Sequence, residues 1–540
     1  MTVSRPVVIT AWIVVAVVLI GIGNGTWVAG GMDSYGYISQ SDRWLRGDVV
    51  VDEPAADVLP WPNAIETLTP IGYLPGPDRR SSVPYYAPGL SILMAIAQWA
   101  GGHCAVFWVV PLTGGLLVAS TFAIGRRLRS DAVGLAAAAL VAMSPAVLFM
   151  LTAPMSDVPA AAFWALAIAL VVSGSTRSPW RSLAGGLSAS IAVLIRPNLV
   201  PIAALIALWL VVEGVLERRS SLGRRLAPAA SFAVGLLPGC LAIAWLNARW
   251  FGSPLKSGPG SLDYLFQIDN LAANLTRYPR WIVETQTPLV LLAIVAILLP
   301  LRNIWRTSFA QRVAVLFGAI FLTVLVMHSL FVPLEEWWYL RYLLAAWPGL
   351  FVALAIVLAR LWEAERLWPR LVGVSVVSVL CFFGLGVAAR RGAFTNASGE
   401  RRYVDAARLL QQRTGTDAVI LSAQHSGTVR YYGGRLTVRY DWIESAWLDR
   451  AVAWLDGRKR HVYALLEEWE RPLFEERFAG QNAAAPLRGN PVFVYRTAGG
   501  PAVYFYDLKA PENASKSDVI EPESTAARCD APMQTYTPLR

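Results

Sequence analysis

Long apolar runs that alternate with short arginine clusters constrain this sequence more than any other feature. The chain has 540 residues, of which 55% are hydrophobic and 16% charged. A soluble protein of this length carries roughly a quarter charged residues. About 20 consecutive apolar residues are enough to cross a bilayer as a helix. We therefore expect a polytopic α-helical membrane protein.

The apolar runs predict about eleven membrane-spanning helices. Their expected ranges are 7–28, 105–125, 132–151, 156–173, 181–195, 198–216, 226–246, 287–301, 312–332, 340–360 and 370–389. The net charge of +10 comes largely from arginines in the short loops between these runs. That distribution is typical of membrane topology signals and argues against a nucleic-acid partner.

Arginine clusters predict the orientation of the chain, because positively charged loops stay in the cytoplasm. The clusters are Arg5; Arg126, Arg127 and Arg129; Arg177 and Arg181; Arg218, Arg219, Arg224 and Arg225; Arg302, Arg306 and Arg312; Arg360, Arg366 and Arg370. They predict a cytoplasmic N-terminus, an uncleaved first helix and a C-terminal region outside the membrane, as in a bacterial plasma-membrane protein.

One apolar segment, Pro88–Ala100, is too short to cross the bilayer. If it crossed, all later arginine clusters would face outward. We expect it to lie as a helix in the outer interface, with Trp99 at headgroup level. Residues 1–395 then form the transmembrane domain, and residues 30–102 one long external loop within it.

Charged residues return after the last apolar run. "ERRYVDAARLLQQRTG" predicts a helix, and "AVILSA", "HVYALLE", "NPVFVYR" and "AVYFYDL" predict strands. Residues 396–510 are expected to form a small extracytoplasmic α/β domain, and residues 511–540 a disordered tail. The four cysteines, Cys104, Cys240, Cys381 and Cys529, suggest neither a disulfide framework nor a zinc site.

Four ionisable residues are expected at the outer edge of the membrane. Asp33 lies in "GGMDSYGYISQSDRWLRGD", and Asp157 in the turn "APMSDVP". Arg196 lies in "LIRPNLVP", and Arg341 in "YLRYLLAAWP". Charged groups at such depths are costly, so each is a candidate for function.

Each candidate also fits a structural role. Asp33 fits a solvated interfacial position and Asp157 a helix cap, while the arginines fit contacts to lipid headgroups. Aromatic anchors and solvated acids are expected nearby: Tyr35, Tyr37, Trp337 and Trp338 as anchors, Asp42 and Asp48 in a solvated loop, and Glu335 and Glu336 as partners of Arg341. Function is favoured because the topology puts two acids and two arginines on one face.

Together with "VPYYAPGLSILMA", "GRRL" and "SPAVLFMLTAPMSDVPAAAFWAL", these motifs resemble the GT-C superfamily of membrane glycosyltransferases over roughly residues 1–390. The nearest branch uses polyprenyl-phosphate sugars and includes protein O-mannosyltransferases and the lipid A aminoarabinose transferase. The resemblance implies that Asp33 is the first-loop catalytic acid, that Asp157 is the second acid, and that Tyr37 matches a family tyrosine. Ser34 and Ala87 depart from the family pattern, which has acidic and basic residues there.

The residue types suit transfer of a sugar from a polyprenyl phosphate to an external glycan, lipid or protein. A carboxylate base takes the proton of the attacking hydroxyl, and arginines bind the departing phosphate. Backside attack would invert the anomeric carbon. We expect Asp33 to be the base and Asp157 to assist it. Phosphate binding is predicted for Arg196, Arg341, Arg79 and Arg80, and the substrate groove for Tyr37, Tyr85, Tyr86, Trp337 and Trp338.

Two other classes of function stay open. One is a polytopic transporter or a flippase for lipid-linked sugars, which would favour mid-helix charges and an internal repeat that the sequence does not display. The other is a non-catalytic membrane assembly partner. A divalent metal between Asp33 and Asp157 is not favoured, because a monophosphate leaving group needs a metal less than a diphosphate does. No other cofactor is expected.

Overall fold

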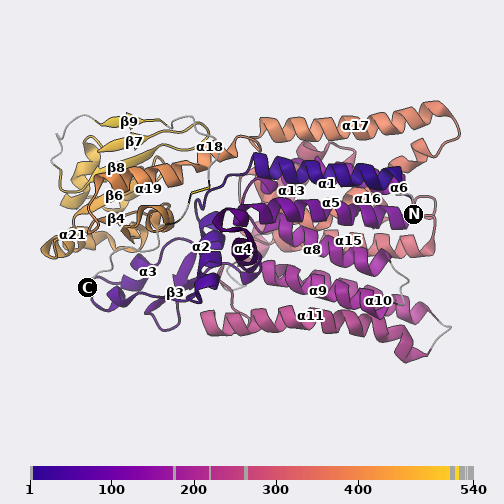
Figure 1. Ribbon diagram of the computed structural model, residues 1–540, viewed down its shortest axis with the longest axis horizontal. Coiled ribbons are helices and arrows are strands. Elements are labelled where there is room, and N and C mark those ends of the chain that lie inside the picture. The colour runs from indigo at the N-terminus through magenta and orange to yellow at the C-terminus, as the bar shows by residue number, and fades with distance from the viewer. Residues whose placement is uncertain are drawn as a thin grey trace.

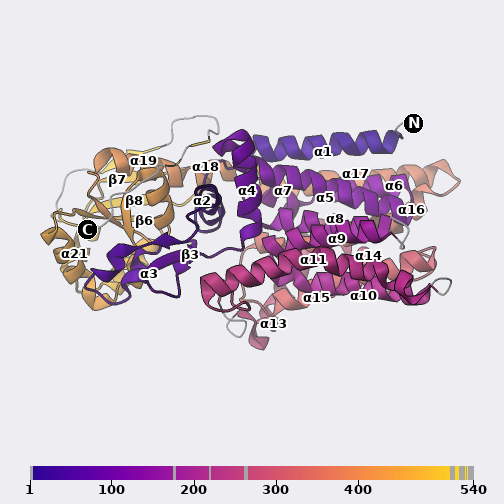
Figure 2. The same cartoon turned by 60° about the horizontal axis from the view of Figure 1, so that its bottom comes forward.

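The computed structural model is elongated, with a helical bundle at one end and a mixed sheet at the other (Figure 1). It describes residues 4–173, 178–217, 221–260, 265–510, 517–521, 529–530 and 532. The N-terminus lies at the end of the bundle farthest from the sheet in both views (Figures 1 and 2). The first external segment lies between the bundle and the sheet.

Seven helical segments within the described residues are long and apolar enough to cross a membrane. They are α1 (Arg5–Gly23), η2 (His103–Trp108) continued by α5 (Val109–Leu128), η3 (Pro197–Leu199) continued by α10 (Val200–Leu216), α11 (Leu222–Phe251), α15 (Ser308–Ser329), η5 (Trp337–Ala346) continued by α16 (Trp347–Trp362), and α17 (Leu367–Arg390). An eighth candidate consists of α6 (Asp131–Ala142) and α7 (Pro145–Leu151), which are bent by 60°. Pro145 lies at the break, where its missing N–H cannot extend the first helix.

The remaining predicted spans are helices, but they are shorter than a typical span. α8 (Asp157–Ser173) and α9 (Pro179–Ile195) have 17 residues each, and α14 (Val290–Leu298) has 9. The predicted count of about eleven spans is therefore supported for seven or eight helices. A further helix, α13 (Leu271–Gln286), lies in the connection between the predicted spans 226–246 and 287–301.

Arginine-rich connections meet at the end of the bundle that holds the N-terminus. Arg129 Nε donates a hydrogen bond to Glu363 over 2.8 Å, and Arg306 donates to the same carboxylate over 2.7 Å. Ser4 donates to Asp131 over 3.0 Å at this end. The N-terminus and three arginine clusters thus share one end, as the predicted topology requires. Three other arginines of the predicted clusters lie outside the described residues: Arg177, Arg218 and Arg219.

The predicted external loop 30–102 is folded. It contains α2 (Asp33–Arg46), η1 (Pro54–Asp57), α3 (Ala64–Leu68) and α4 (Pro88–Gly101), with an antiparallel sheet of β1 (Val51–Asp52), β3 (Ser81–Pro84) and β2 (Tyr73–Pro75) in that order. The predicted helix over Pro88–Ala100 is confirmed as α4. It runs across the end of the bundle in Figure 2, and Trp99 is 80% exposed. Both features suit a helix at the membrane interface.

α2 is polar in sequence, yet its residues from Ser34 to Asp42 are buried. The prediction that Asp42 lies in a solvated loop is therefore wrong. Asp42 accepts hydrogen bonds from Gln98, over 2.7 Å, and from the Tyr431 hydroxyl. Because α2 packs between α4 and the C-terminal part, its polar groups bond to protein instead of water.

The C-terminal part contains a six-stranded mixed sheet in the order β5-β4-β6-β8-β7-β9. The strands are β4 (Val419–Leu421), β5 (Leu436–Val438), β6 (Val462–Glu467), β7 (Phe493–Tyr495), β8 (Val503–Asp507) and β9 (Asp518–Ile520). The helices are α18 (Asn396–Glu400), α19 (Arg402–Arg413), α20 (Ser426–Thr428), the π-helical turn η6 (Val429–Gly433), η7 (Tyr440–Trp442), η8 (Ser445–Trp447), α21 (Leu448–Gly457), α22 (Glu470–Arg477) and η9 (Asn482–Arg488). The one predicted helix and four predicted strands correspond to α19, β4, β6, β7 and β8.

The C-terminal tail is attached to the rest of the protein at two points. β9 pairs in parallel with β7, and Cys529 forms a disulfide with Cys104. The expectations of a disordered tail and of no disulfide are therefore wrong for the described part of the tail. The two cysteines are 425 residues apart, so their spacing carries no sign that they meet. The other residues of the tail, 511–516, 522–528, 531 and 533–540, lie outside the described ranges.

Candidate active site

Two acids and two arginines from four separate motifs meet in one place, which we call the Asp33 cluster. Asp33 begins α2, Asp157 begins α8, Arg196 follows α9 and Arg341 lies in η5. Arg341 donates to Asp33 over 3.2 Å, and its Nε lies 4.0 Å from Asp157. Arg196 forms an ion pair with the other oxygen of Asp157. The four charged residues predicted on one face are thus direct neighbours.

Aromatic rings lie beneath both arginines. The Arg196 guanidinium is 5.1 Å from the ring centre of Tyr342. The Arg341 guanidinium is 5.2 Å from the ring of Tyr339 and 5.3 Å from that of Tyr342. His328 stacks on Tyr342 with the ring centres 5.0 Å apart. Cation–π contacts of this kind orient the guanidinium planes and partly offset their desolvation.

Tyrosines hold the opposite side of Asp33. The Tyr86 hydroxyl donates a hydrogen bond to Asp33 Oδ1. The Tyr86 ring lies 4.6 Å from that of Tyr37 and 4.9 Å from that of Tyr85. Burial raises the pKa of Tyr86 and Tyr37, and the charge of Asp33 raises the pKa of both further. Both hydroxyls therefore stay protonated, and Tyr86 fixes the carboxylate as a donor. A side chain at Gly36 would meet the Tyr86 ring at 2.6 Å, so glycine permits this contact.

The two acids differ in their access to solvent. The Asp33 side chain is 32% exposed, whereas that of Asp157 is 2% exposed. A buried carboxylate needs charged partners, and Asp157 has an arginine on each side. Nε of Arg341 is buried beside Asp157 and makes no hydrogen bond within the described part of the chain. Of the two acids, Asp33 is therefore the one that a substrate can reach.

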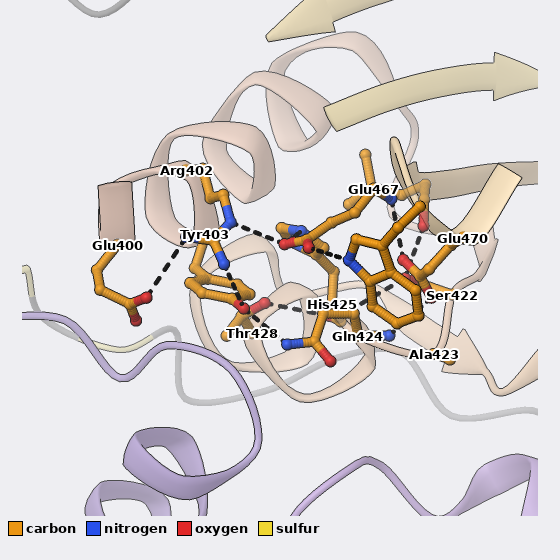
Figure 3. Close-up of polar contacts among 12 residues, drawn as sticks. Glu400, Arg402, Tyr403, Ser422, Ala423, Gln424, His425, Thr428, Glu467 and Glu470 are labelled. Atoms are coloured by element: carbon orange, nitrogen blue, oxygen red, sulfur yellow. Dashed lines mark hydrogen bonds and ion pairs between the residues drawn. The ribbon is translucent and has the colours of Figure 1, made fainter. Parts of the chain in front are cut away.

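The C-terminal part packs against the segment that leads into Asp33. A side chain at Gly30 would meet Glu400 Oε2 at 2.5 Å and the Tyr403 ring at 2.6 Å. Figure 3 shows Glu400 and Tyr403 beside Arg402, which donates to the Tyr403 hydroxyl over 2.9 Å and to Glu467 over 2.8 Å. The entry to α2 is thus covered by residues from α18 and α19.

Behind this contact lies the Glu467 cluster, made of Glu467, Arg402, His425 and Trp469. The first three are buried and are labelled in Figure 3, whereas Trp469 is 49% exposed. His425 Nε2 lies 3.2 Å from Glu467, and Trp469 donates to the same carboxylate over 2.6 Å. Burial alone would raise the pKa of Glu467, but the bonds from His425 and the charge of Arg402 lower it to about 2. Nearby Glu470 forms no ion pair with any residue that the structure describes, and burial raises its pKa to about 7.

The structure does not bring Arg79 and Arg80 to the Asp33 cluster. Both lie between β2 and β3, at the tip of that hairpin. Arg79 pairs with Glu66, and Arg80 lies 3.2 Å from Asp57. Their side chains are 59% and 70% exposed. The predicted role of these two arginines in phosphate binding therefore has no support from their placement.

Trp337 and Trp338 belong to the packing of η5 against α7. The Trp337 ring lies 5.2 Å from Phe149, and Trp338 stacks on the same ring at 5.8 Å. Glu335 lies 3.5 Å from Arg277. Within the described residues it forms no ion pair with Arg341, contrary to the expectation that it would. Both tryptophans thus fit the structural alternative better than the predicted groove.

Among the residues that the structure describes, no group of three or more His, Cys, Asp or Glu side chains is placed to hold a metal ion. Asp33 and Asp157 instead share Arg341, whose charge lies between them.

Solved membrane proteins have a similar fold. ArnT from Cupriavidus metallidurans in the apo state is 14% identical, with a TM-score of 0.55 over 94% of this chain and 99% of that chain. The oligosaccharyltransferase of Archaeoglobus fulgidus with a tethered acceptor peptide is 12% identical, with a TM-score of 0.56 over 92% and 74% of the two chains. The arabinofuranosyltransferase AftD from Mycobacteria is 14% identical, with a TM-score of 0.52 over 95% and 40%.

A family model for dolichyl-phosphate-mannose-protein mannosyltransferases also matches, over residues 84–245. No curated protein matches the sequence. The chain has the GT-C fold. The resemblance predicted from the motifs is thereby confirmed for the fold.

Within this GT-C fold, motif reasoning missed three residues around the site. Tyr339 and Tyr342 flank Arg341 in "YLRYLL", so the local sequence already contained their signal. Glu400 carried no such signal, because it reaches the Asp33 segment only through the docking of the C-terminal part.

Proposed function

We propose that this protein is an inverting glycosyltransferase that moves a sugar from a polyprenyl phosphate to an acceptor outside the membrane. The observation that carries the proposal is a solvent-accessible Asp33 held beside two tyrosine-supported arginines. The match to a mannosyltransferase family model supports a lipid-phosphate sugar donor. A further structure of ArnT, with a TM-score of 0.53, contains undecaprenyl phosphate, which supports the same donor class.

In the proposed reaction, Asp33 is the general base. Its carboxylate takes the proton of an acceptor hydroxyl while that oxygen bonds to the anomeric carbon. The bond from the anomeric carbon to the phosphate oxygen breaks, and its electron pair leaves with the polyprenyl phosphate. Attack opposite to the leaving group inverts the anomeric carbon. Tyr86 keeps the base in place through its hydrogen bond.

Arg341 and Arg196 bind the phosphate as its charge grows. Arginine suits this task, because its several N–H donors can bind two phosphate oxygens at once. Asp157 is the positioning residue, since it contacts both arginines from a buried site. Tyr37, Tyr85 and Tyr86 line the side of the proposed active site that contacts the sugar.

We also propose that the arginine-rich end of the bundle faces the cytoplasm and that the sheet lies outside. Positively charged loops favour the cytoplasmic side. The Cys104–Cys529 disulfide joins the opposite end of the bundle to the tail, and disulfides persist in oxidising compartments outside the cytoplasm. The reaction then occurs at the outer face, on a hexosyl or pentosyl unit destined for a glycan, lipid or protein of the cell envelope.

Release of polyprenyl phosphate tests this function. The purified protein is incubated with polyprenyl-phosphate sugars and an envelope extract as acceptor, and polyprenyl phosphate is measured by mass spectrometry. We expect the wild type to release it and Asp33→Asn to release almost none. Asp57→Asn is the matched control, because Asp57 is an exposed acid of the same external segment and pairs with the exposed Arg80 over 3.2 Å.

The same assay separates the rival functions. A flippase would move the lipid-linked sugar from one leaflet of a vesicle membrane to the other without releasing polyprenyl phosphate. A non-catalytic partner would do neither. Release at wild-type rate by a folded Asp33→Asn protein would refute the assignment of the base.

A further inference from the structure

α2 presents polar side chains on two sides. Asp33 and Tyr37 face the Asp33 cluster, whereas Tyr35, Ser39 and Asp42 follow at helical spacing on another face. The second face, which Arg46 continues at the same spacing, lines a cavity of about 430 Å³ together with Arg43, the residue after Asp42. The motif that supplies the proposed base thus also forms the wall of a separate cavity.

Several distant segments complete this cavity. Tyr73 of β2, His103 of η2 and Tyr431 of η6 line it beyond α2. Pro532 of the tail lines it as well, and the Cys104–Cys529 disulfide tethers that tail beside His103. The cavity therefore exists only when the C-terminal part is docked on the first external segment.

Charges in the cavity wall are already paired. Arg43 and Arg46 lie 3.5 Å and 3.6 Å from Asp48. In the deeper part, Arg430 donates to Glu53 over 2.7 Å. The lining contains three arginines against three acids, the third being Asp42, which already accepts two hydrogen bonds. The charges of the lining balance one another, so the cavity favours an uncharged ligand over an anionic one.

The lining of the cavity also contains aromatic rings, which belong to three tyrosines. The Tyr35 ring lies 6.0 Å from that of Tyr73 and 6.0 Å from that of Tyr431. Rings of this kind present apolar faces with polar edges. A sugar has matching surfaces, since its C–H faces pack on rings while its hydroxyls bond to carboxylate, amide and hydroxyl groups.

An apolar groove of about 360 Å³ adjoins the cavity, and Leu45 lines both. The other residues of the groove are Trp44, Ile92, Ala95, Ile96 and Trp99. Ile96 is 58% exposed and Trp99 is 80% exposed, on the helix that crosses the end of the bundle. A polar cavity beside an apolar groove at the membrane edge has the shape of a site for an amphiphile.

We propose that the cavity binds an uncharged saccharide unit of a lipid-anchored glycan and that the groove holds the start of its anchor. We assign this glycan as the acceptor, an assignment that rests on the proposed function. The helix rise places Asp42 about 13 Å beyond Asp33, on a different face of α2. The bound unit is therefore not the one that reacts, and its binding keeps a long acceptor on the enzyme.

Saturation-transfer NMR on the full chain in lipid nanodiscs tests this site. The probes are maltose, octyl glucoside below its micelle concentration, and octyl phosphocholine. We expect saturation of the sugar-ring protons of both glycosides. Tyr73→Leu, which removes a ring from the cavity, should weaken both signals about fivefold. The matched control Tyr463→Leu, in the C-terminal sheet outside the cavity, should leave both unchanged.

A second variant separates the cavity from the groove. Leu45 is 45% exposed, so Leu45→Asp should fold normally, weaken octyl glucoside and leave maltose unchanged. Unchanged ring signals in folded Tyr73→Leu would overturn the proposal. Equal signals from octyl phosphocholine and octyl glucoside, with none from maltose, would also overturn it, since they would indicate an apolar groove only.

Asp33→Asn distinguishes this proposal from the proposed function. Loss of polyprenyl phosphate release with unchanged glycoside signals would support both. Retained release with glycoside binding would refute Asp33 as the base and leave the saccharide site standing as a binding site without an assigned acceptor role.

Discussion

The Asp33 cluster and the Glu467 cluster are built from the same kinds of groups. Gly30, which precedes Asp33, packs on Tyr403, and Tyr403 bonds to Arg402 of the second cluster. Each sets a carboxylate against an arginine and an aromatic donor: Tyr86 in the first, Trp469 in the second. Their access differs, because the Glu467 side chain is 2% exposed and that of Asp33 is 32% exposed. The Glu467 carboxylate is bonded by protein side chains and is closed to solvent, whereas part of the Asp33 carboxylate is open to a substrate.

This difference separates a structural ion pair from a candidate catalytic one. Loss of either partner of a buried, fully bonded carboxylate destabilises the fold. An accessible carboxylate beside arginines has the arrangement that acid–base chemistry needs. Residue types alone do not distinguish the two, and the experiments below test whether access does.

The largest effect is expected at Asp33. Asp33→Asn should lower the transfer rate by roughly 100- to 10,000-fold, because it removes the proposed base, with little change in thermal unfolding. Asp157→Asn should lower both rate and stability, because Arg196 and Arg341 lose the buried charge between them. Rates of polyprenyl phosphate release and unfolding temperatures measure both outcomes. Equal losses of stability in the two variants would contradict the distinction.

The opposite pattern is expected in the C-terminal cluster. Glu467→Gln removes a buried charge that bonds Arg402, His425 and Trp469, and should destabilise the fold by about 3–5 kcal/mol. The rate per folded molecule should stay near that of the wild type. Denaturant unfolding and active-site titration report the two quantities. The control is Glu468→Gln, since Glu468 is the exposed neighbour.

The disulfide should have a smaller effect. Cys104→Ser and Cys529→Ser should each destabilise the docked C-terminal part by about 2–4 kcal/mol, because the link constrains a very long loop. Thermal unfolding with and without reductant measures the loss, which should be absent in Cys240→Ser, a free cysteine. A peptide map without reductant that lacks the Cys104–Cys529 link would disprove the pairing directly.

A pH dependence gives the smallest effect. Burial raises the pKa of Glu470 from 4.5 to about 7, so its stabilising contribution is complete below 4.5 and is lost as the pH rises to 7. Glu470→Gln should therefore gain stability relative to wild type across that range. Burial lowers the pKa of His425, so the contribution of His425 to stability is lost as the pH falls. This effect is the same in both proteins and cancels in their difference. Unfolding temperatures of the pair between pH 4.5 and 7 should converge at the acidic end. A constant difference across the range would contradict the shift.

Local patterns predicted much of the fold. Apolar runs located the bundle helices, and α4 was placed at the interface because its run is too short to cross. Alternating apolar residues located β4, β6, β7 and β8. The predicted span count is supported for seven or eight of about eleven helices, since α14, for example, has only 9 helical residues.

The candidate site was predicted in part. Asp33, Asp157, Arg196 and Arg341 could be named because charges at the membrane edge are costly and therefore stand out. Arg79 was misjudged, because sequence could not show that Glu66 neutralises it within a folded loop. The sequence identifies a charged residue in an apolar segment, but the tertiary fold determines which residue pairs with it.

The sequence by itself determined that this is a membrane protein, where its helices run, and which charged residues stand out as candidates for a site. Hydrophobic length and charge cost are local properties, so they can be read along the chain. Only the tertiary structure decided that Asp33 is accessible while Asp42 is buried, and that Cys104 meets Cys529. Those outcomes depend on contacts between segments hundreds of residues apart, which no local pattern encodes.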